Sequence, residues 1–420
     1  MNKYFHSVVL EEEKCNGCTN CLRRCPIEAI RVKDKKATII KERCIDCGEC
    51  IRVCPYHAQK SITDDLEMLN NFEFNIAIPS MPLYGQFDVG TDMDKVYQGI
   101  KDLGFDYIYD EARAADIVAE VFKEMVKDSS FQRPIISALC PAIVRLIQVR
   151  FPSLIDNIAR VESPMEVAAR LAKKEVIEKF GISLQKIGIF YLTQCPAKVT
   201  SIRKPIGISE SHLNGAISIT KLYGHIIKNA KKIQNNETFQ KGSPLGVGWA
   251  RVGGQSYAIG VENYIAVDGI ENVINVLEEI ELGKLNNLDF FEGLACTGGC
   301  VGGPLNVENP FIAKSRIRKL SKIKSKAKKI NKNYVKMLQD EGYIGWTENI
   351  YPKGIMTLDD DMKVALEKIE KIKEIAGLLP GLDCGSCGSP TCTALAEDIV
   401  RGFGNLEDCV FRMKENMKKR

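Results

Sequence analysis

Residues 187–198 read IGIFYLTQCPAK, which predicts a buried strand that ends just before a cysteine. Two other segments follow the same pattern, because PIISALC ends at Cys140 and FFEGLAC ends at Cys296. A further apolar run, Phe74–Pro79, ends beside Ser80. In open α/β sheets the carboxyl ends of the strands face a common crevice where ligands bind. We therefore expect these four strand ends to meet at one site.

Strand-like and helix-like runs alternate around this segment, which is typical of an α/β domain with largely parallel sheets flanked by helices. The predicted strands are Phe74–Pro79, Pro134–Leu139, Ile187–Leu192, Tyr264–Val267 and Leu288–Leu294. The predicted helices are Asp116–Lys127, Ala142–Arg150, Pro164–Phe180 and Glu271–Glu281.

Two more amphipathic helices are expected towards the C-terminus, over Lys314–Lys336 and Asp359–Gly377. The first is strongly basic, and its apolar face would carry Ile317, Leu320, Ile323 and Ile330. Its basic side is either an ordinary solvated surface or a docking face for an acidic electron carrier.

The composition is that of a globular protein: of 420 residues, 45% are hydrophobic and 27% are charged. This excludes a mainly disordered chain. A net charge of +4 gives no support for binding to nucleic acid or to a membrane surface. No apolar run approaches the roughly 18–20 residues that span a bilayer, and residues 1–11 lack the pattern of a signal peptide. We expect a cytoplasmic protein with no membrane insertion.

The sixteen cysteines fall in tight clusters, which in a reducing compartment indicates metal ligation. They divide the chain into three predicted domains, residues 1–65, 66–350 and 351–420. The first contains Cys-x2-Cys-x2-Cys-x3-Cys-Pro twice, a specific signal for two 4Fe–4S clusters, and we expect a small α+β module. The last cysteine of each repeat should ligate the other cluster. The two predicted sets are Cys15, Cys18, Cys21 and Cys54, and Cys44, Cys47, Cys50 and Cys25. A pair of zinc sites is the alternative.

Four cysteines far apart in the sequence form the second group: Cys140, Cys195, Cys296 and Cys300. Four thiolates at converging strand ends would hold another cubane. The glycines of residues 296–304, CTGGCVGGP, would let the backbone pass close to a bulky inorganic group. The alternative is that these are buried structural cysteines.

The third group is Cys384, Cys387, Cys392 and Cys409, in a small and mainly helical C-terminal domain. Gly385 and Gly388 permit a tight loop around a cube, and residues 393–403 are predicted to form a helix. This group resembles a 4Fe–4S domain of anaerobic electron-transfer proteins, with a zinc site as the alternative. The N-terminal module, which contains both repeats, likewise resembles a bacterial two-cluster ferredoxin.

Residues 72–345 resemble the catalytic domain of iron-only (FeFe) hydrogenases. The resemblance rests on four segments: SALCP at 137–141, QCPAK at 194–198, LACTGGC at 294–300 and AIPS at 77–80. It implies an H-cluster, in which a 4Fe–4S cube is bridged by Cys300 to a diiron unit with CO, cyanide and azadithiolate. Lys198 would hydrogen-bond a cyanide, and Ser80 beside Pro79 would approach the dithiolate.

The resemblance also implies partners. These are H2 and protons, an electron carrier such as ferredoxin or a downstream signalling protein, and hydrogenase maturation proteins.

Several positions depart from the family pattern. Leu139 stands where efficient enzymes have the cysteine that first accepts a proton. Thr193 and Leu294 replace methionines, and Met165, after Ser163 and Pro164, replaces a glutamine. These changes resemble a divergent, sensory-type branch and predict slow turnover. An alternative proton route could use Glu120, Glu166 or Glu292, although each could also be a structural or surface carboxylate.

Three functions follow as hypotheses. The first is a divergent FeFe hydrogenase, the second is a slow hydrogen or redox sensor that signals to a partner, and the third is an iron–sulfur assembly protein without the diiron unit.

Overall fold

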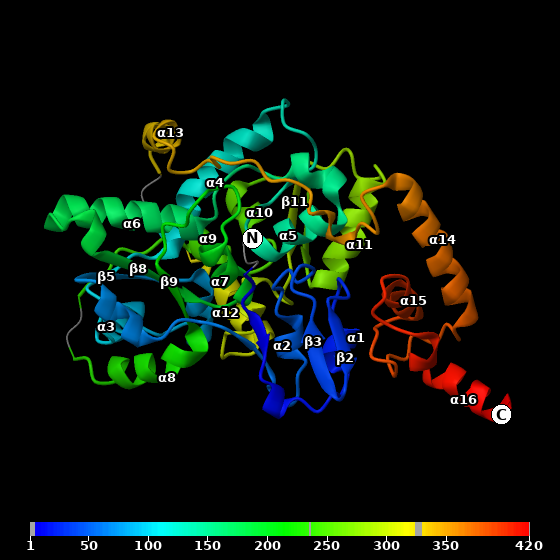
Figure 1. The fold of residues 1–420 in the computed structure, drawn as a ribbon. Helices are drawn as coiled ribbons and strands as arrows, with labels where there is room; N and C mark the ends of the chain where they lie inside the picture. The colour runs from blue at the N-terminus through cyan, green and yellow to red at the C-terminus, as the bar shows by residue number, and fades with distance from the viewer. Residues whose placement is uncertain (1–4, 235–236, 324–329, 420) are drawn as a thin grey trace. The chain divides into compact units, whose positions relative to one another are not determined.

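The computed structural model describes residues 5–234, 237–323 and 330–419, coloured along the chain in Figure 1. The chain divides into two compact units. The larger unit is Ile62–Pro352, and the smaller one combines Met1–Ser61 with Lys353–Arg420. The predicted first and last domains therefore belong to one structural unit. None of the helices within the described ranges combines the length and apolar character that crossing a bilayer requires.

The N-terminal part of the smaller unit contains two antiparallel pairs of strands and two helices of one turn each. The pairs are β1 (Val8–Leu10) with β4 (Gln59–Ser61), and β2 (Ile30–Lys33) with β3 (Lys36–Ile39). The helices are α1 (Asn20–Arg23) and α2 (Glu49–Arg52). The repeat of the sequence is thus a repeat of structure, because each half places one short helix within its cysteine motif.

The C-terminal part of the smaller unit is helical, as predicted. Its helices are α14 (Met362–Leu378), α15 (Cys392–Val400) and α16 (Val410–Lys419). Helix α14 begins three residues later than Asp359, because the side chain of Asp361 accepts hydrogen bonds from the backbone N–H groups of Lys363 and Val364 and so caps the helix there.

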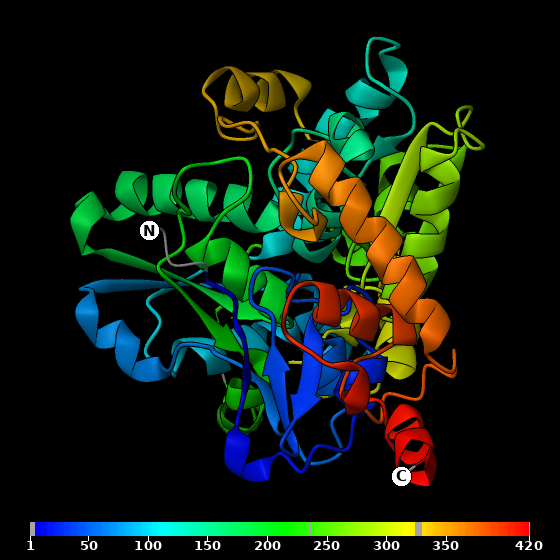
Figure 2. The same cartoon turned by 45° about the vertical axis from the view of Figure 1, so that its right-hand side comes forward.

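Both ends of the chain meet in this unit, where red α15 lies beside blue β2 and β3 (Figure 2). The guanidinium of Arg31 on β2 makes two hydrogen bonds, of 2.6 and 3.0 Å, to the carboxylate of Asp398 on α15. Both side chains are only 10% exposed. A second pair joins Arg43 to Glu397 at 2.5 Å. Bidentate pairs between buried side chains fix orientation as well as adding energy.

The larger unit is built on two parallel sheets. The first has the order β6-β5-β8-β9, formed by Tyr107–Ile108, Phe74–Pro79, Ile187–Thr193 and Gly215–Ser218. The second has the order β10-β11-β7, formed by Tyr264–Asp268, Phe290–Leu294 and Ile135–Ile136. Every neighbouring pair in both sheets is parallel, which confirms the predicted α/β class.

Helices cover both faces of the first sheet (Figure 1). On one face lie α3 (Met93–Lys101) and α8 (Ile219–Ala230), and on the other lies α6 (Pro164–Phe180), with α4 (Glu111–Lys127) packed against it. All seven residues of β8 are buried as a result. A parallel strand covered on both faces is expected to be continuously apolar, which is why this run was conspicuous in the sequence.

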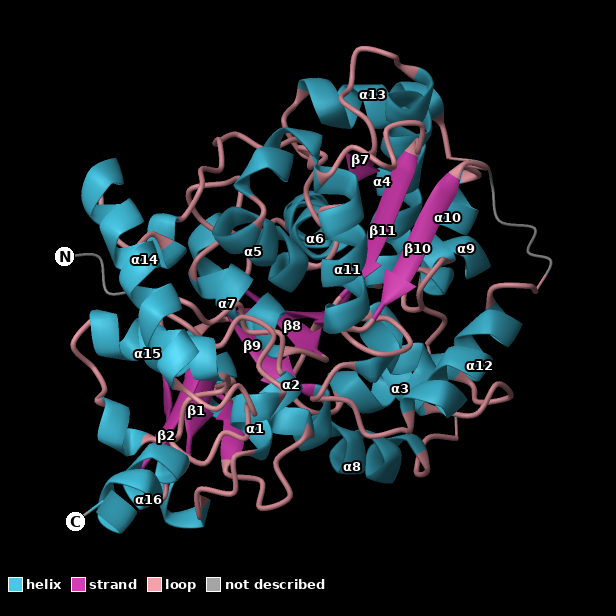
Figure 3. Ribbon diagram, turned by 90° about the vertical axis from the view of Figure 1, so that its right-hand side faces the viewer, coloured by secondary structure: helices cyan, strands magenta, loops and turns pink. Residues whose placement is uncertain are grey.

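The second sheet is covered in the same way (Figure 3). Helices α10 (Gly254–Ile259) and α11 (Ile270–Glu281) pack against β10 and β11. The remaining helices of this unit are α5 (Pro141–Arg150), α7 (Pro196–Arg203), α9 (Pro244–Gly248), α12 (Pro310–Leu320) and α13 (Lys332–Asp340).

The predicted basic helix over Lys314–Lys336 is wrong, because the structure has two helices there, α12 and α13. Helix α12 ends at Leu320, and a new helix is capped by Asn331, whose side chain accepts from the backbone N–H of Asn333. Ile317 is buried, but Ile323 lies beyond α12 and is 54% exposed. Part of the intervening segment, residues 324–329, lies outside the described residues.

Gly388 lies where the C-terminal part of the chain packs closely against strand β2. It has φ +84°, and a Cβ there would lie 1.8 Å from the carbonyl oxygen of Val32 on β2. The Gly388 carbonyl also accepts a hydrogen bond from the Val32 N–H at 2.9 Å. A side chain at position 388 would therefore separate α15 and its loop from the strand pair.

We predict that Gly388→Ala lowers the thermal unfolding midpoint of the protein more than Gly402→Ala does. Gly402 also has positive φ, +83°, but a Cβ there meets nothing within 4 Å. Its substitution should add only the left-handed strain of about 1–2 kcal/mol. Equal losses in the two variants, measured by anaerobic calorimetry, would show that the contact with Val32 is unimportant.

Candidate active site and metal centres

Four cysteines meet at the carboxyl ends of the strands in the larger unit. Cys195 follows β8, Cys296 follows β11, and Cys140 lies four residues beyond β7. Cys300 begins a short 3-10 helix in the next loop. The four thiols lie close enough to interact electrostatically, since the charges of Cys140, Cys195 and Cys296 all raise the pKa of Cys300. The convergence predicted from the strand ends is therefore present.

Two of these cysteines directly precede helices. Cys140 is the N-cap of α5 and Cys195 is the N-cap of α7, and each helix starts with proline, which lacks the N–H that would be unpaired in the first turn. The amino end of a helix carries partial positive charge, so both helices favour negative charge at the sulfur atoms.

Burial makes these thiols poor acids without a metal. It raises the pKa of Cys195 to about 12, and the charges of Cys296 and Cys140 add to the effect, whereas Lys198 opposes it. Burial likewise raises the pKa of Cys300, against the opposing charge of Lys198. Bound metal ions reverse this preference, because they deprotonate coordinating thiols. The donor set therefore fits an iron–sulfur cube.

A buried ion pair lies beside the cysteines. The Nζ of Lys198 donates to Glu111 Oε1 at 3.0 Å and to the hydroxyl of Tyr191 at 2.8 Å. Lys198 is 2% exposed, and Glu111 is fully buried. Burial alone would lower the pKa of Lys198, but the charges of Glu111, Cys300 and Cys195 outweigh it and raise the pKa. Lys198 is thus a fixed cation, and one of its three N–H donors remains for an anionic ligand.

Glu111 connects this pair to the strand ends. Its Oε2 accepts from the backbone N–H of Met81 at 2.9 Å, directly after Ser80, and both oxygens lie 3.0 Å from the Tyr191 hydroxyl. The sequence analysis missed Glu111, because nothing in the local spacing relates it to Lys198. The only available signal was an acidic residue soon after an apolar run, which is a common pattern.

Ser80 supports the presence of a ligand. The residue follows β5 and buried Pro79, is fully buried, and has no hydrogen-bond partner for its Oγ among the described residues. Gln194, directly before Cys195, has an unpartnered buried Oε1 as well. Unpaired buried polar atoms are rare in proteins and require an explanation such as a bound group.

The other predicted site residues are buried or begin a helix. Leu139, Met165, Thr193 and Leu294 are at most 3% exposed, and Ser163 is the N-cap of α6. Thr193 has a local structural role, because its Oγ1 accepts from the Cys195 N–H at 3.2 Å. Leu139 packs in the main hydrophobic core of the unit. Their contacts with a cofactor remain a prediction.

The glycines near Cys300 have a packing role in the protein itself, while their expected approach to an inorganic group stays a prediction. A Cβ at Gly299 would lie 2.5 Å from the backbone nitrogen of Val252, and one at Gly303 would lie 2.4 Å from the carbonyl of Gln194. These glycines therefore allow close packing of one protein backbone on another, and this packing fixes the loop that carries Cys300.

The cysteines of the smaller unit line three separate cavities. Cys15, Cys18, Cys21 and Cys54 line the first, and Cys25, Cys44, Cys47 and Cys50 line the second. Cys384, Cys387, Cys392 and Cys409 line the third. These groupings are the same as the predicted ligand sets, including the exchange of Cys25 and Cys54 between the two repeats.

Comparison with known families agrees with this geometry. Residues 80–260 and 228–304, which together exceed half of the chain, match the family described as iron-only hydrogenase large subunit, C-terminal domain. The chain belongs to the iron-only hydrogenase family. Residues 7–55 match the 4Fe-4S dicluster domain, and residues 379–411 match a putative Fe-S cluster family.

Individual relatives are distant. The NADP-reducing hydrogenase subunit HndD of Solidesulfovibrio fructosivorans is 22% identical over 72% of this chain and 59% of its own length. Iron hydrogenase 1 of Clostridium pasteurianum is 26% identical over 56% and 50%. The chain thus spans about half of the length of the curated hydrogenases it matches.

Two further matches bear on the fold and on the alternatives. A variant of the [FeFe]-hydrogenase HydA1 from Chlamydomonas reinhardtii shares the fold, with a TM-score of 0.51 over 66% of this chain and 92% of that one at 14% identity. The cytosolic Fe-S cluster assembly factor NAR1 of Candida dubliniensis is 28% identical, over 29% of this chain and 21% of its own length.

The buried pair of Glu111 and Lys198 leads to a testable prediction about stability. Glu111→Ala leaves the buried ammonium of Lys198 without its carboxylate and should lower the free energy of unfolding by about 3–5 kcal/mol. The matched control is Glu73→Ala, which removes an exposed pair with Lys186 and should change it by less than about 1 kcal/mol. Denaturant titration under argon gives both values, and similar effects in the two variants would contradict a dependence of Lys198 on Glu111.

Proposed function

We propose that this protein interconverts H2 with protons and electrons at an H-cluster held by Cys140, Cys195, Cys296 and Cys300, and that its turnover is slow. The observation that carries the proposal is the buried cation of Lys198 among four converging thiols, with the unpartnered Oγ of Ser80 nearby. The diiron unit would supply the cleavage and formation of the H–H bond.

The residues of the chain bind and orient this group. Cys300 would bridge the cube to the diiron unit. The third N–H of Lys198 would donate to a cyanide, held in direction by Glu111 and Tyr191. Ser80 Oγ would donate to the dithiolate. Buried donors that are fixed before the ligand binds need no reorganisation, which is the main advantage of such a site.

Electrons would pass between the H-cluster and cubes in the three cavities of the smaller unit. In this proposal the C-terminal cluster, held by Cys384, Cys387, Cys392 and Cys409, exchanges electrons with a carrier or a signalling partner. Its packing against β2, through Arg31 and Asp398, supports electron exchange with the N-terminal clusters, because it holds the two modules in one orientation.

Slow turnover follows from Leu139. A leucine cannot carry a proton, and the residue is only 3% exposed within the core, so water has little access there. The same feature favours a hydrogen or redox sensor, in which slow turnover is sufficient for signalling.

An assembly protein without the diiron unit is the second candidate, favoured by the similarity to NAR1. The unpartnered buried Oγ of Ser80 argues against it, because this hydroxyl has no evident partner beside a cube alone. Infrared spectroscopy separates the two candidates, since only the diiron unit carries CO and cyanide.

We predict about 18 iron atoms per chain after maturation, from four cubes and one diiron unit, together with infrared bands of CO and cyanide. Cys300→Ala should abolish these bands and the H2 activity, because it removes the bridging thiolate. Cys18→Ala is the matched control, which should weaken an N-terminal cluster and leave the bands. Native protein with about 16 iron atoms and no such bands would instead support the assembly protein.

A further inference from the structure

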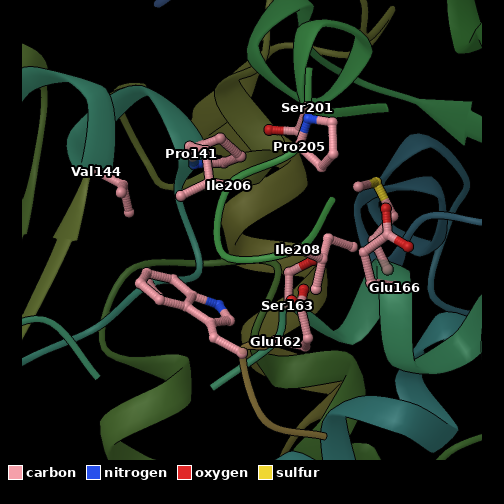
Figure 4. Close-up of a pocket in the computed structure, with 12 residues that line it drawn as sticks. Pro141, Val144, Glu162, Ser163, Glu166, Ser201, Pro205, Ile206 and Ile208 are labelled. Carbon is pink, nitrogen blue, oxygen red and sulfur yellow. The ribbon is translucent and has the colours of Figure 1, made fainter. Parts of the chain in front are cut away.

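A small cavity borders the region of the H-cluster ligands (Figure 4). We call it the acid pocket, since Glu162, Ser163 and Glu166 line one side of it. Ala138 and Pro141, which flank Leu139 and Cys140 in the sequence, line it as well. Its volume of about 30 Å³ exceeds the roughly 10–15 Å³ that one water molecule requires. The pocket can therefore hold ordered water between two carboxyl groups.

A larger, open cleft lies next to the acid pocket. It has a volume of about 530 Å³ and is lined by Arg170, Lys173 and His212, among others. Ile208 lines both cavities, so its side chain forms part of the wall between them. Solvent in the cleft thus comes within one residue of the acid pocket.

Glu166 connects the two cavities. It lines the acid pocket, while its carboxylate accepts from the Oγ of Ser211 at 2.5 Å and from the backbone N–H of His212 at 3.0 Å. On the other side, the charge of Lys198 acts on Glu166. Met165, at a position where the family has a residue flanking the diiron unit, is its direct neighbour and also lines the pocket.

Glu162 completes the pocket. It is 4% exposed, and its Oε1 has no hydrogen-bond partner among the described residues. A buried carboxyl group that lines a cavity with room for water can exchange a proton through that water. The charge of Arg170 acts on both glutamates and favours the ionised form of each.

The other two candidate acids are engaged elsewhere. Glu120 forms a surface pair with Lys123 at 2.7 Å. Glu292 is fully buried, and its oxygens accept from the backbone N–H groups of Gly253 and Ser256 and from the Ser256 hydroxyl. Glu292 therefore fixes the start of α10.

We propose that Glu166 and Glu162, linked by water in the acid pocket, carry protons between the H-cluster region and the open cleft, in place of the thiol that is absent at position 139. This inference rests on the proposed function. For each H2 oxidised, two protons would leave one after the other through the pair to Ser211 and cleft water, and two electrons would leave through the cubes. Each carboxyl group returns to its starting state after every proton.

The acid–base properties of the pocket agree with this role. Burial, followed by the charge of Glu166, raises the pKa of Glu162 to about 8, while Arg170 opposes the shift. Burial also raises the pKa of Glu166, against hydrogen bonds from Ser211 and His212 and the charges of Arg170 and Lys198. Burial, followed by the charges of Arg170 and Lys173, lowers the pKa of His212 to about 4, so its ring is neutral at pH 7.

Turnover of the matured protein provides the first test. Glu166→Gln should lower H2 uptake and evolution by about 100-fold, with the CO and cyanide bands unchanged, because general acid–base groups contribute about 10²–10⁴ in rate. Glu120→Gln is the matched control and should leave the rate within twofold. A Glu166→Gln variant with native rate and normal bands would overturn the relay alone. Native protein without bands would overturn the proposed function instead.

A second measurement does not depend on turnover. In protein that carries only its cubes, the infrared band of a protonated carboxyl group should persist at pH 7 and disappear with a midpoint of about 8, and it should be absent in Glu162→Gln. The sign follows from the raised pKa, since the proton stays bound until the pH passes that value. A native spectrum without this band at pH 7 would overturn the role of Glu162.

Discussion

One constraint determines the arrangement around the four cysteines: the buried ammonium group of Lys198 must have a partner of opposite charge. Lys198 has almost no contact with solvent, and removing the partner of a buried charge is far more destabilising than removing a surface pair. Its partner Glu111 also binds the N–H of Met81 and the hydroxyl of Tyr191. The pair thus joins the ends of β5 and β8 to the starts of α4 and α7, and it orders the site whether or not a metal is bound.

The features that sequence predicted well were those set by short-range patterns. Strand β5 and helix α6 have the predicted limits, Phe74–Pro79 and Pro164–Phe180, because covered parallel strands are continuously apolar and the helix has proline at its start and glycine at its end. The cysteine groupings followed from spacing in the repeats and from strand order in the larger unit. Residues whose partners lie far away in the chain, such as Glu111 and Asp398, gave no comparable signal.

Long-range contacts also explain the errors. The glycines at 299 and 303 make room for the backbone at Val252 and Gln194, a contact that the local sequence did not indicate. A periodic run of isoleucines suggested one basic helix, yet the cap at Asn331 starts a second one. The pairing of Arg31 with Asp398 joins two segments that the sequence presented as separate domains. In each case tertiary contacts decided among alternatives that local sequence left open.

In the proposed function, the site has the groups that would bind the H-cluster and lacks the thiol that would accept a proton. The cation of Lys198, the hydroxyl of Ser80 and the four thiols keep their positions as long as the strand ends keep theirs. The strand ends are held by the buried core around them. Leu139 fills its position with apolar volume, so a proton there would meet no acceptor. The acid pocket lies beside this blocked position and next to an open cleft. In our proposal the apolar side chain of Ile208, which lines both cavities, slows proton exchange between the acid pair and solvent, so that proton delivery and not the metal site would limit turnover.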